Sequence, residues 1–363
     1  MFNKTIKRQL PSILSSNRPA VFRNAIGTKI DTGRVVDAVD SVFENGQKVI
    51  TDCDECIVTE DLGKLHFQKL FQNRDNFKIS DEKVFEEILI PEHFRSSLYE
   101  LEKLNSKLAQ EYSTLKQMVI KSYFQAKYGI SHPQEFIDLM LEFDTKTFKV
   151  EAFLRENSTL GTHTGIKNYL LIRCRLYHAM DLNILNDSYN HLVRYNNIGP
   201  INFQYSSPKT LIYDTLNRAS GKPIICSTNL LGIVNSNFDL SFAEHINGTQ
   251  YGECIETNTF VGRLNTEPVF KDEKTNIVLR NLGLPETDSQ ASETIGFMAG
   301  DSASNDLPTM LSALTGNKGY AMVRIKGEPF DYYSNINDWT DKFRKAGIDD
   351  ETILKRVFFV DER

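Results

Sequence analysis

The stretch "VITDCDECIVTED" (residues 49–61) carries two interleaved motifs that predict different chemistry. Cys53 and Cys56 form a Cys-x-x-Cys, which is typical of a redox pair or of half a zinc site. Asp52 and Asp54 form an Asp-x-Asp, which is typical of the start of a magnesium site. The apolar run before Asp52 predicts a short buried strand that ends in a turn at these residues. The residues elsewhere in the sequence indicate which of the two interpretations is favoured.

The overall composition is that of an ordinary globular protein, with 363 residues of which 40% are hydrophobic and 25% charged. This length is enough for about two domains. The net charge of -6 gives no basic excess, so we predict no nucleic-acid partner. No apolar run approaches the roughly 18 residues of a membrane-spanning helix. The five cysteines are too few and too scattered for a disulfide framework, which favours a reducing compartment.

The N-terminal segment is basic. Residues 1–30 contain six Lys or Arg residues and no Asp or Glu, and the six are Lys4, Lys7, Arg8, Arg18, Arg23 and Lys29. On composition we expect a solvated leader that packs loosely on the core, and a cytoplasmic protein. A segment for organelle targeting or export, or a basic arm for an acidic partner, is the alternative, although the N-terminus lacks a secretory hydrophobic region.

Helical patterns dominate from about residue 81 to 200. The segment 94–130 has no Gly or Pro before its last two residues, and its apolar residues recur at the spacing of one helix face. These residues are Leu98, Leu101, Leu104, Leu108, Tyr112 and Leu115. Residues 84–90, 133–143 and 165–180 continue in the same style. We therefore expect a large helical block.

Strand and helix patterns alternate outside this block. Short apolar strands are predicted at 48–51, 223–226, 295–300 and 318–328. This alternation predicts an α/β fold, a Rossmann-like parallel sheet with helices on both faces. The block enters just after the first strand, where it would cover the ligand-binding edge of the sheet as a cap. The predicted division is a leader at 1–45, an α/β core at 46–80 and 201–330, a helical cap at 81–200, and a C-terminal extension packed on the core at 331–363.

Polar side chains directly follow three of the predicted strands, and a lysine opens the helix before the third of them. These residues are Asp52 and Asp54, then Ser227, then Lys274, and finally Asp301 and Asp306 in "GDSASND". Because the carboxyl ends of parallel strands meet at one edge of a sheet, we expect these side chains to lie together. Clustered carboxylates suit Mg²⁺, and a hydroxyl and an ammonium beside them suit phosphoryl oxygens. The pattern predicts a magnesium site for a small phosphorylated substrate.

This order of motifs resembles the haloacid dehalogenase (HAD) superfamily, in its phosphoserine-phosphatase-like branch. "VITDCDECI" is similar to the family's Asp-x-Asp-x-Thr, with Cys56 where Thr is usual. "GKPIICST" is similar to the second motif, "DEKTNIVLRNL" with Lys274 to the third, and "GDSASND" to the fourth. The resemblance covers roughly residues 46–60 and 205–328, and the helical block looks like the family's cap, although it is long.

The resemblance implies a phosphomonoesterase that works through an aspartyl-phosphate. Asp52 would attack phosphorus, and Asp54 would protonate the leaving oxygen and later activate water. The metal ligands would be Asp52, the backbone carbonyl of Asp54, and Asp301. Asp306 would support the metal shell or orient Lys274. Lys274 and a strand-end hydroxyl would hold the other phosphoryl oxygens.

Two of the proposed site residues have an alternative residue nearby in the sequence. Ser227 directly follows the apolar strand and is preferred as the hydroxyl, with Thr228 as the alternative. Lys274 is preferred over Lys271 as the lysine of the site. The basic residues of the helical block that we expect to contact the substrate are Lys167, Arg173 and Arg175.

Cysteine chemistry is the less favoured interpretation of the opening stretch. A redox pair needs a helix start directly after the motif, and "IVTED" is a poor one. Cys174, Cys226 and Cys254 are scattered, so no second cluster completes a zinc site. Two other functions remain open. One is a phosphotransferase or phosphomutase with the same site, and the other is a HAD-fold protein whose helical block binds a partner.

Overall fold

The structure is a computed structural model that describes residues 20–90, 92–157, parts of 170–176, 208–325 with short gaps, and 332–361. Its main strands are β1 (Val21–Arg23), β2 (Lys29–Ile30), β3 (Lys48–Thr51), β4 (Ile224–Leu230), β5 (His245–Thr249), β8 (Ile295–Gly300), β9 (Tyr320–Arg324) and β10 (Val357–Asp361). They form one sheet in the order β2-β1-β10-β9-β8-β3-β4-β5. A separate hairpin consists of β6 (Tyr251–Cys254) and β7 (Thr259–Leu264).

The sheet is mostly parallel. The strands from β10 to β5 all run in the same direction, while β1 and β2 add antiparallel strands at one edge. The carboxyl ends of β3, β4 and β8, which carry the candidate site residues, are neighbours because β3 lies between β8 and β4. The bounds of β3 and β8 are those predicted, whereas β4 continues beyond its predicted end.

Helices cover both faces of the sheet. One face carries α1 (Thr32–Glu44) and α9 (Leu211–Arg218), and the other carries α11 (Asp272–Asn281), α13 (Ala303–Thr315), α14 (Tyr332–Lys345) and α15 (Asp350–Arg356). Successive strand residues point to opposite faces. Val49 accordingly joins the core on the α1 face and Ile50 the core on the α11 face. The predicted α/β fold class is confirmed. Two short helices, α10 (Leu231–Asn235) and α12 (Asp288–Thr294), follow β4 and precede β8.

The two ends of the chain differ from the prediction. Residues 20–45 are an integral part of the sheet layer and not a loosely packed leader. Phe22 of β1 is fully buried, and Val35 and Val39 of α1 pack in the core. At the other end β10 pairs with β9 inside the sheet. The count of basic residues over 1–30 obscured β1, which has only three residues. Residues 1–19 lie outside the described part of the chain.

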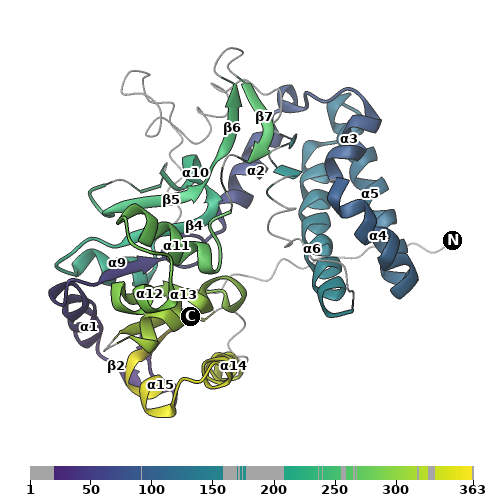
Figure 1. Ribbon diagram of the computed structural model, residues 1–363. Helices are drawn as coiled ribbons and strands as arrows, with labels where there is room; N and C mark the ends of the chain where they lie inside the picture. Colours follow the sequence, from purple (N-terminus) through teal and green to yellow (C-terminus); the bar gives the residue numbers. More distant parts are fainter. Residues whose placement is uncertain are drawn as a thin grey trace.

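The helical block stands beside the sheet (Figure 1). It contains α3 (Glu82–Leu89), α4 (Glu92–Leu104), α5 (Ser106–Lys127) and α6 (Pro133–Asn157), and α2 (Leu62–Gln72) with the short 3-10 helix η1 (Arg74–Asn76) leads into it. Phe67 and Phe71 of α2 contact Phe136 of α6, with ring centroids 6.0 and 5.4 Å apart. This aromatic contact joins the block to the segment that follows β3.

The predicted continuous helix at 94–130 is broken at Asn105. The side chain of Asn105 accepts a hydrogen bond from the backbone N–H of Leu108 and so caps the start of α5. Asparagine is favoured at this position because its oxygen satisfies a helix N–H that lacks a partner. Apolar spacing alone did not reveal the break.

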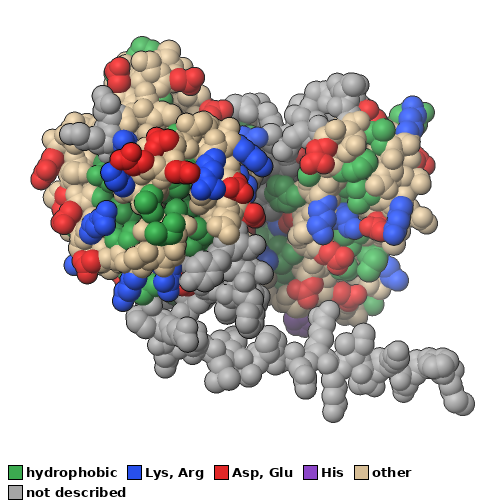
Figure 2. Space-filling view, turned by 90° about the horizontal axis from the view of Figure 1, so that it is seen from below, with side chains coloured by type: hydrophobic (Ala, Val, Ile, Leu, Met, Phe, Trp, Pro, Cys, Tyr) green, Lys and Arg blue, Asp and Glu red, His purple; other side chains and the backbone are tan. Residues whose placement is uncertain are grey.

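The described surface is mixed in charge. On the face shown in Figure 2, Lys or Arg and Asp or Glu side chains are interspersed over both the sheet part and the helical block. Within the described residues, every helix is too short or too polar to cross a bilayer.

Candidate active site

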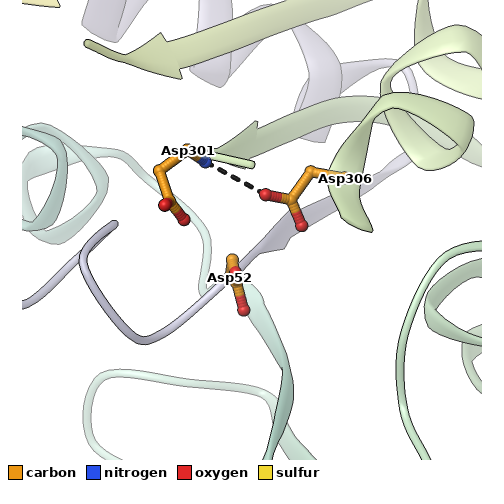
Figure 3. Close-up of side chains that lie close together, drawn as sticks. All are labelled: Asp52, Asp301 and Asp306. Atoms are coloured by element: carbon orange, nitrogen blue, oxygen red, sulfur yellow. Dashed lines mark hydrogen bonds between the residues drawn. The ribbon is translucent and has the colours of Figure 1, made fainter. Parts of the chain in front are cut away.

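Three aspartates meet at the carboxyl ends of β3 and β8. Asp52 follows β3, and its backbone N–H donates to the carbonyl of Ala299 in β8 over 2.8 Å. Asp301 follows β8, and Asp306 lies in the first turn of α13. Each of the three acids offers one carboxylate oxygen, and these oxygens lie within 4.8 Å of one another (Figure 3). Carboxylates this close repel one another unless a cation lies between or beside them.

Lys274 supplies one such cation. Its Nζ lies 2.9 Å from Oδ1 of Asp52 and 2.6 Å from Oδ1 of Asp306, and its side chain is fully buried. Burial alone would lower the pKa of Lys274, but the carboxylates of Asp306 and Asp52 outweigh it and raise that pKa. Lys271 instead precedes α11, with its Nζ 5.6 Å from the ring centroid of Phe270. The structure thus brings Lys274 to the aspartates.

Both oxygens of Asp306 bind groups of the chain itself. Oδ1 pairs with Lys274, while Oδ2 accepts the backbone N–H groups of Asp301 at 3.0 Å and Ser302 at 2.9 Å. Gly300 is needed beside it, because a Cβ at this position would collide with the Asp306 carboxylate. Asp306 therefore holds both the lysine and the loop that carries Asp301.

Asp52 lies at the bottom of the site and is almost fully buried. Its Oδ1 also accepts the backbone N–H of Cys53 at 2.9 Å. Burial raises the pKa of Asp52 to about 6, against the opposing effect of Lys274. The carboxylate therefore remains mostly ionised at neutral pH, which a nucleophile requires.

Asp54 is held by three donors. Its Oδ1 accepts the backbone N–H of Leu62 at 2.8 Å, and its Oδ2 accepts from the hydroxyl of Ser227 at 3.1 Å and the amide of Asn229 at 2.8 Å. Burial, followed by the nearby charges of Asp61 and Asp52, raises the pKa of Asp54 to about 8. A carboxyl with this pKa holds its proton at neutral pH, which suits a general acid.

The two candidate hydroxyls occupy different places. Ser227 is fully buried and donates to Asp54. Thr228 lines the pocket, donates to the carbonyl of Val269 at 3.1 Å and accepts from the amide of Asn305 at 3.1 Å. The sequence preferred Ser227, but of these two residues it is Thr228 that lines the pocket.

Sequence reasoning missed two amides at this site. Asn229 binds Asp54, and Asn305 binds Thr228. Asn229 was detectable in principle, because residues two apart on a strand point to the same face and Ser227 had been singled out. Asn305 directly precedes Asp306, but its contact depends on how the loop after β8 folds. No spacing in the sequence reveals such a contact.

The cysteines of the opening stretch lie outside the pocket. Cys53 and Cys56 are fully buried, and neither lines the cavity. Burial raises the pKa of both thiols well above its ordinary value. The Sγ of Cys56 lies 3.7 Å from Oγ1 of Thr51, in contact with the end of β3. These thiols favour the neutral form, whereas redox and zinc chemistry both need a thiolate.

The pocket has a volume of about 220 Å³. The strand ends contribute Asp52, Asp54, Thr228, Asn229, Asp301, Ser302 and Asn305 to its lining. Glu55 and Asp61 come from the segment between β3 and α2, and Phe148 and Leu170 from the helical side. The strand ends and the helical block therefore share one cavity.

The basic residues expected to contact the substrate have other partners. Arg173 is buried, pairs with Asp144 of α6, and lies with its guanidinium carbon 3.4 Å from the ring centroid of Phe67. Arg175 donates to the carbonyl of Glu87 over 3.4 Å. Neither arginine lines the pocket. Lys167 lies outside the described residues.

No family model and no curated protein matches the sequence. Two solved structures are similar at 12% identity. A conserved functionally unknown protein from Anaerococcus prevotii DSM 20548 has a TM-score of 0.42, with 86% of this chain and 87% of that chain covered. A HAD family hydrolase from Salmonella enterica subsp. enterica serovar Typhi has a TM-score of 0.33, with 89% and 86% covered. At this level of likeness, function has to be argued from the site itself.

Proposed function

We propose that this protein is a Mg²⁺-dependent phosphomonoesterase of the HAD superfamily, acting through an aspartyl-phosphate. The observation that carries the proposal is the Lys274 ammonium between Asp52 and Asp306, beside Asp301. These residues come from separate motifs whose order along the chain resembles that superfamily. Their meeting at neighbouring strand ends is the arrangement that the resemblance implies.

The residues fit a divalent cation. Three ionised carboxylates and one ammonium leave two negative charges at the cluster. A divalent cation would neutralise them, and Mg²⁺ favours a few carboxylate oxygens with its remaining positions open. Asp52, Asp301 and the backbone carbonyl of Asp54 would hold it, with Asp306 positioning Lys274. When bound, Mg²⁺ supplies charge neutralisation for the phosphoryl oxygens.

The two chemical steps use the two aspartates of the opening stretch. An oxygen of Asp52 forms a bond to phosphorus while the bond to the leaving oxygen breaks, and Asp54 gives its proton to that oxygen. Asp54 then takes a proton from water, whose oxygen attacks phosphorus and frees Asp52 and inorganic phosphate. Lys274 holds a phosphoryl oxygen during both steps, and Ser227 holds Asp54. Thr228 joins Lys274 by turning its hydroxyl from the carbonyl of Val269 to a second phosphoryl oxygen.

Hydrolysis of p-nitrophenyl phosphate tests the proposal. Activity is expected to disappear in EDTA, to return with Mg²⁺, and to be absent in Asp52→Asn. The matched control is Asp288→Asn, an exposed aspartate at the start of α12, which is expected to retain full activity. Full activity after exhaustive chelation, or in Asp52→Asn, would refute the proposal. Phosphoryl transfer to an added alcohol in place of water would reassign the protein as a phosphotransferase.

The partner-binding alternative makes a different prediction. A protein that only binds a partner through its helical block would show no hydrolysis with any phosphomonoester, with or without Mg²⁺. The full set of paired acids and the buried lysine speaks against it, because a buried lysine between carboxylates is costly to maintain.

A further inference from the structure

We propose that Arg324, the last residue of β9, is a positioning residue that holds the backbone beside Asp54 in its working geometry. The inference rests on the proposed function, because it concerns the residue to which that function assigns both proton transfers. Arg324 is not among the residues that line the pocket. Its Nη1 donates to the carbonyl of Glu55 over 2.7 Å and to the carbonyl of Val58 over 3.5 Å.

Arg324 reaches this segment from a strand that is not adjacent to β3, because β8 lies between β9 and β3 in the sheet. Met322, two residues before Arg324, packs in the core on the α1 face, and alternate residues of a strand share a face. Ile57 and Val58 of the segment after β3 pack in the same core. The side chain of Arg324 therefore extends on the face where this segment lies.

Glu55 directly follows Asp54 in a strained backbone conformation. Its φ of 52° lies in the left-handed region, which disfavours residues other than glycine because Cβ comes close to a carbonyl oxygen. Such a conformation persists only where the surrounding contacts enforce it. The bond from Arg324 to the carbonyl of Glu55 itself is one of these contacts.

Other hydrogen bonds close residues 53–60 into a compact turn. The backbone N–H groups of residues 56–58 all donate to the carbonyl of Cys53, over 3.1 to 3.3 Å. The hydroxyl of Thr210 donates to the carbonyl of Cys56 over 2.7 Å. Arg324 adds a charged donor to this set, and charge-assisted hydrogen bonds are roughly twice as strong as neutral ones.

The position of the Asp54 carboxyl depends on this turn. Its hydrogen-bond donors are Leu62 at the start of α2, and Ser227 and Asn229 on β4, at 2.8 to 3.1 Å. The carboxyl meets these donors only when the backbone that carries it is held in place. A displacement of about 1 Å at a catalytic group can lower a rate by about 10²-fold.

Asp52 is held by other contacts. Its backbone N–H donates to Ala299 of β8, and its carboxylate pairs with Lys274. Loss of Arg324 should therefore impair proton transfer by Asp54 and leave the attack by Asp52 unaffected.

Single-turnover kinetics of Arg324→Met test this separation. Methionine retains an unbranched apolar stem and removes the donors. With Mg²⁺ and an alkyl phosphate, whose leaving oxygen needs a proton, the rate of the first step should fall at least about tenfold. The burst rate with p-nitrophenyl phosphate should stay unchanged, because p-nitrophenolate leaves without a proton. An equal fall with both substrates, or no fall with either, would overturn the inference.

Two further variants serve as the control and as a milder change. Arg23→Met removes a bond of the same kind, from Arg23 to the carbonyl of Gly27 over 2.9 Å, and should leave both rates unchanged. Arg324→Lys keeps a charged donor on a shorter side chain, so its loss should be smaller and again confined to the alkyl phosphate. A loss that Arg324→Lys shows equally with both substrates would contradict the positioning role.

Replacing Glu55 tests whether the effect passes through its backbone. In the Arg324→Met background, Glu55→Gly removes the penalty on positive φ and should restore much of the rate lost with the alkyl phosphate. Glu55→Ala removes the same side chain but keeps the penalty, so it should restore none of that rate. Equal rates in the two double variants would refute the assignment to the Glu55 backbone.

Hydrogen exchange, measured by mass spectrometry over residues 53–60, distinguishes failure of this inference from failure of the proposed function. Exchange at residues 56–58 should become faster in Arg324→Met and not in Arg23→Met. If wild-type protein hydrolyses phosphomonoesters but exchange is unchanged in Arg324→Met, the proposed function stands and the inference fails. If wild-type protein hydrolyses none while exchange becomes faster in Arg324→Met, the proposed function fails and Arg324 remains the anchor of this turn.

Discussion

The Nζ atom of Lys274 lies 2.9 Å from Oδ1 of Asp52, and neither side chain has appreciable contact with solvent. The contact explains how a carboxylate can stay ionised at a buried position, because Lys274 opposes the rise in pKa that burial causes. Lys274 is in turn held by Asp306 at 2.6 Å. The three residues form one electrostatic unit.

Removing this lysine is expected to destabilise the fold strongly. Lys274→Met leaves Asp52 and Asp306 buried without their cation, and breaking a buried pair in this way costs about 3–5 kcal/mol. The loss in urea-unfolding free energy should be larger at about pH 7 than at about pH 5, because protonation neutralises the carboxylates at the lower pH. Lys271→Met, at the rival lysine, should change stability by less than about 0.5 kcal/mol. Equal losses in the two variants would contradict the assignment.

The metal ligands are expected to differ in their effect on Mg²⁺ affinity. Asp301→Asn removes a proposed ligand and should weaken Mg²⁺ binding, measured by calorimetry, by at least about tenfold. Asp306→Asn should weaken it less and lower stability more, because Asp306 binds Lys274 and the backbone of the Asp301 loop. If Asp306→Asn weakened Mg²⁺ binding more than Asp301→Asn and lowered stability less, Asp306 would be the metal ligand and Asp301 the residue that positions Lys274.

The strand ends were predictable because they depend on local patterns. The runs before Asp52 and Asp301 are short and apolar, and each strand ends where polar residues begin. Parallel pairing then brings the ends together. The position of Lys274 near these aspartates was predictable from the order of the motifs along the chain, because Lys274 lies at the start of the helix that precedes β8 in sequence.

The fine geometry of the site was not predictable from these patterns. Which of Ser227 and Thr228 lines the pocket depends on how β4 continues past its predicted end. The ion pair between Arg173 and Asp144 depends on how two helical segments pack against each other in the folded chain. The strands β1 and β10 at the chain ends were missed because they are short. They also pair with each other across nearly the whole length of the chain, which no local pattern reveals.

Gly63 is expected to be required for the position of Asn229. A Cβ at Gly63, in the first turn of α2, would collide with the side-chain amide of Asn229, which binds Asp54 at 2.8 Å. Gly63→Ala and Asn229→Ala should each lower kcat on an alkyl phosphate by up to about tenfold, the effect of losing one hydrogen bond that positions the general acid. The loss on p-nitrophenyl phosphate should be smaller, because p-nitrophenolate leaves without a proton.

A remote amide provides the control for this prediction. Asn281→Ala removes a hydrogen bond to Asn247 outside the pocket and should leave kcat unchanged. An equal loss on alkyl and p-nitrophenyl substrates in Gly63→Ala would show that the added methyl group acts through stability and not through Asp54.

The buried pair of Arg173 and Asp144 is expected to stabilise the helical block in a pH-dependent way. Burial, opposed by Arg173, raises the pKa of Asp144 to about 6 from an ordinary value of 3.8. The ionised form is therefore less favourable in the folded state, and its contribution to stability falls as pH rises from about 4 to about 6. Arg173→Met removes the cation that opposes the rise in the pKa of Asp144. The loss of folding stability with rising pH should therefore become larger and extend to higher pH.

The size of this effect and its rescue can be measured by thermal unfolding. Arg173→Met should cost about 3–5 kcal/mol above the pKa of Asp144. The double variant Arg173→Met/Asp144→Leu should recover most of the loss, because it buries no unpaired charge. Arg175→Met, at the less buried neighbour, is the control and should have little effect. Failure of the double variant to recover would mean that Arg173 acts through other contacts.

The last prediction separates Asp52 from Asp54. Asp54→Asn keeps the nucleophile but loses the proton donor and acceptor, a contribution of about 10²–10⁴-fold. With p-nitrophenyl phosphate the first step needs no proton, so rapid-quench kinetics should show a burst of about one p-nitrophenolate per enzyme. Slow turnover should follow, because water is no longer activated. Intact mass should show a phosphoryl group on Asp52.

The pH profile of the wild type gives an independent test of Asp54. Burial raises its pKa to about 8, so Asp54 carries its proton below that pH and loses it above. With an alkyl phosphate, whose leaving oxygen needs a proton, kcat should fall as pH rises through about 8, and this fall should be absent in Asp54→Asn. Normal turnover in Asp54→Asn, combined with loss of activity in Cys53→Ala or Cys56→Ala, would move the chemistry to the cysteines. The two buried thiols with raised pKa argue that both cysteine variants will remain active.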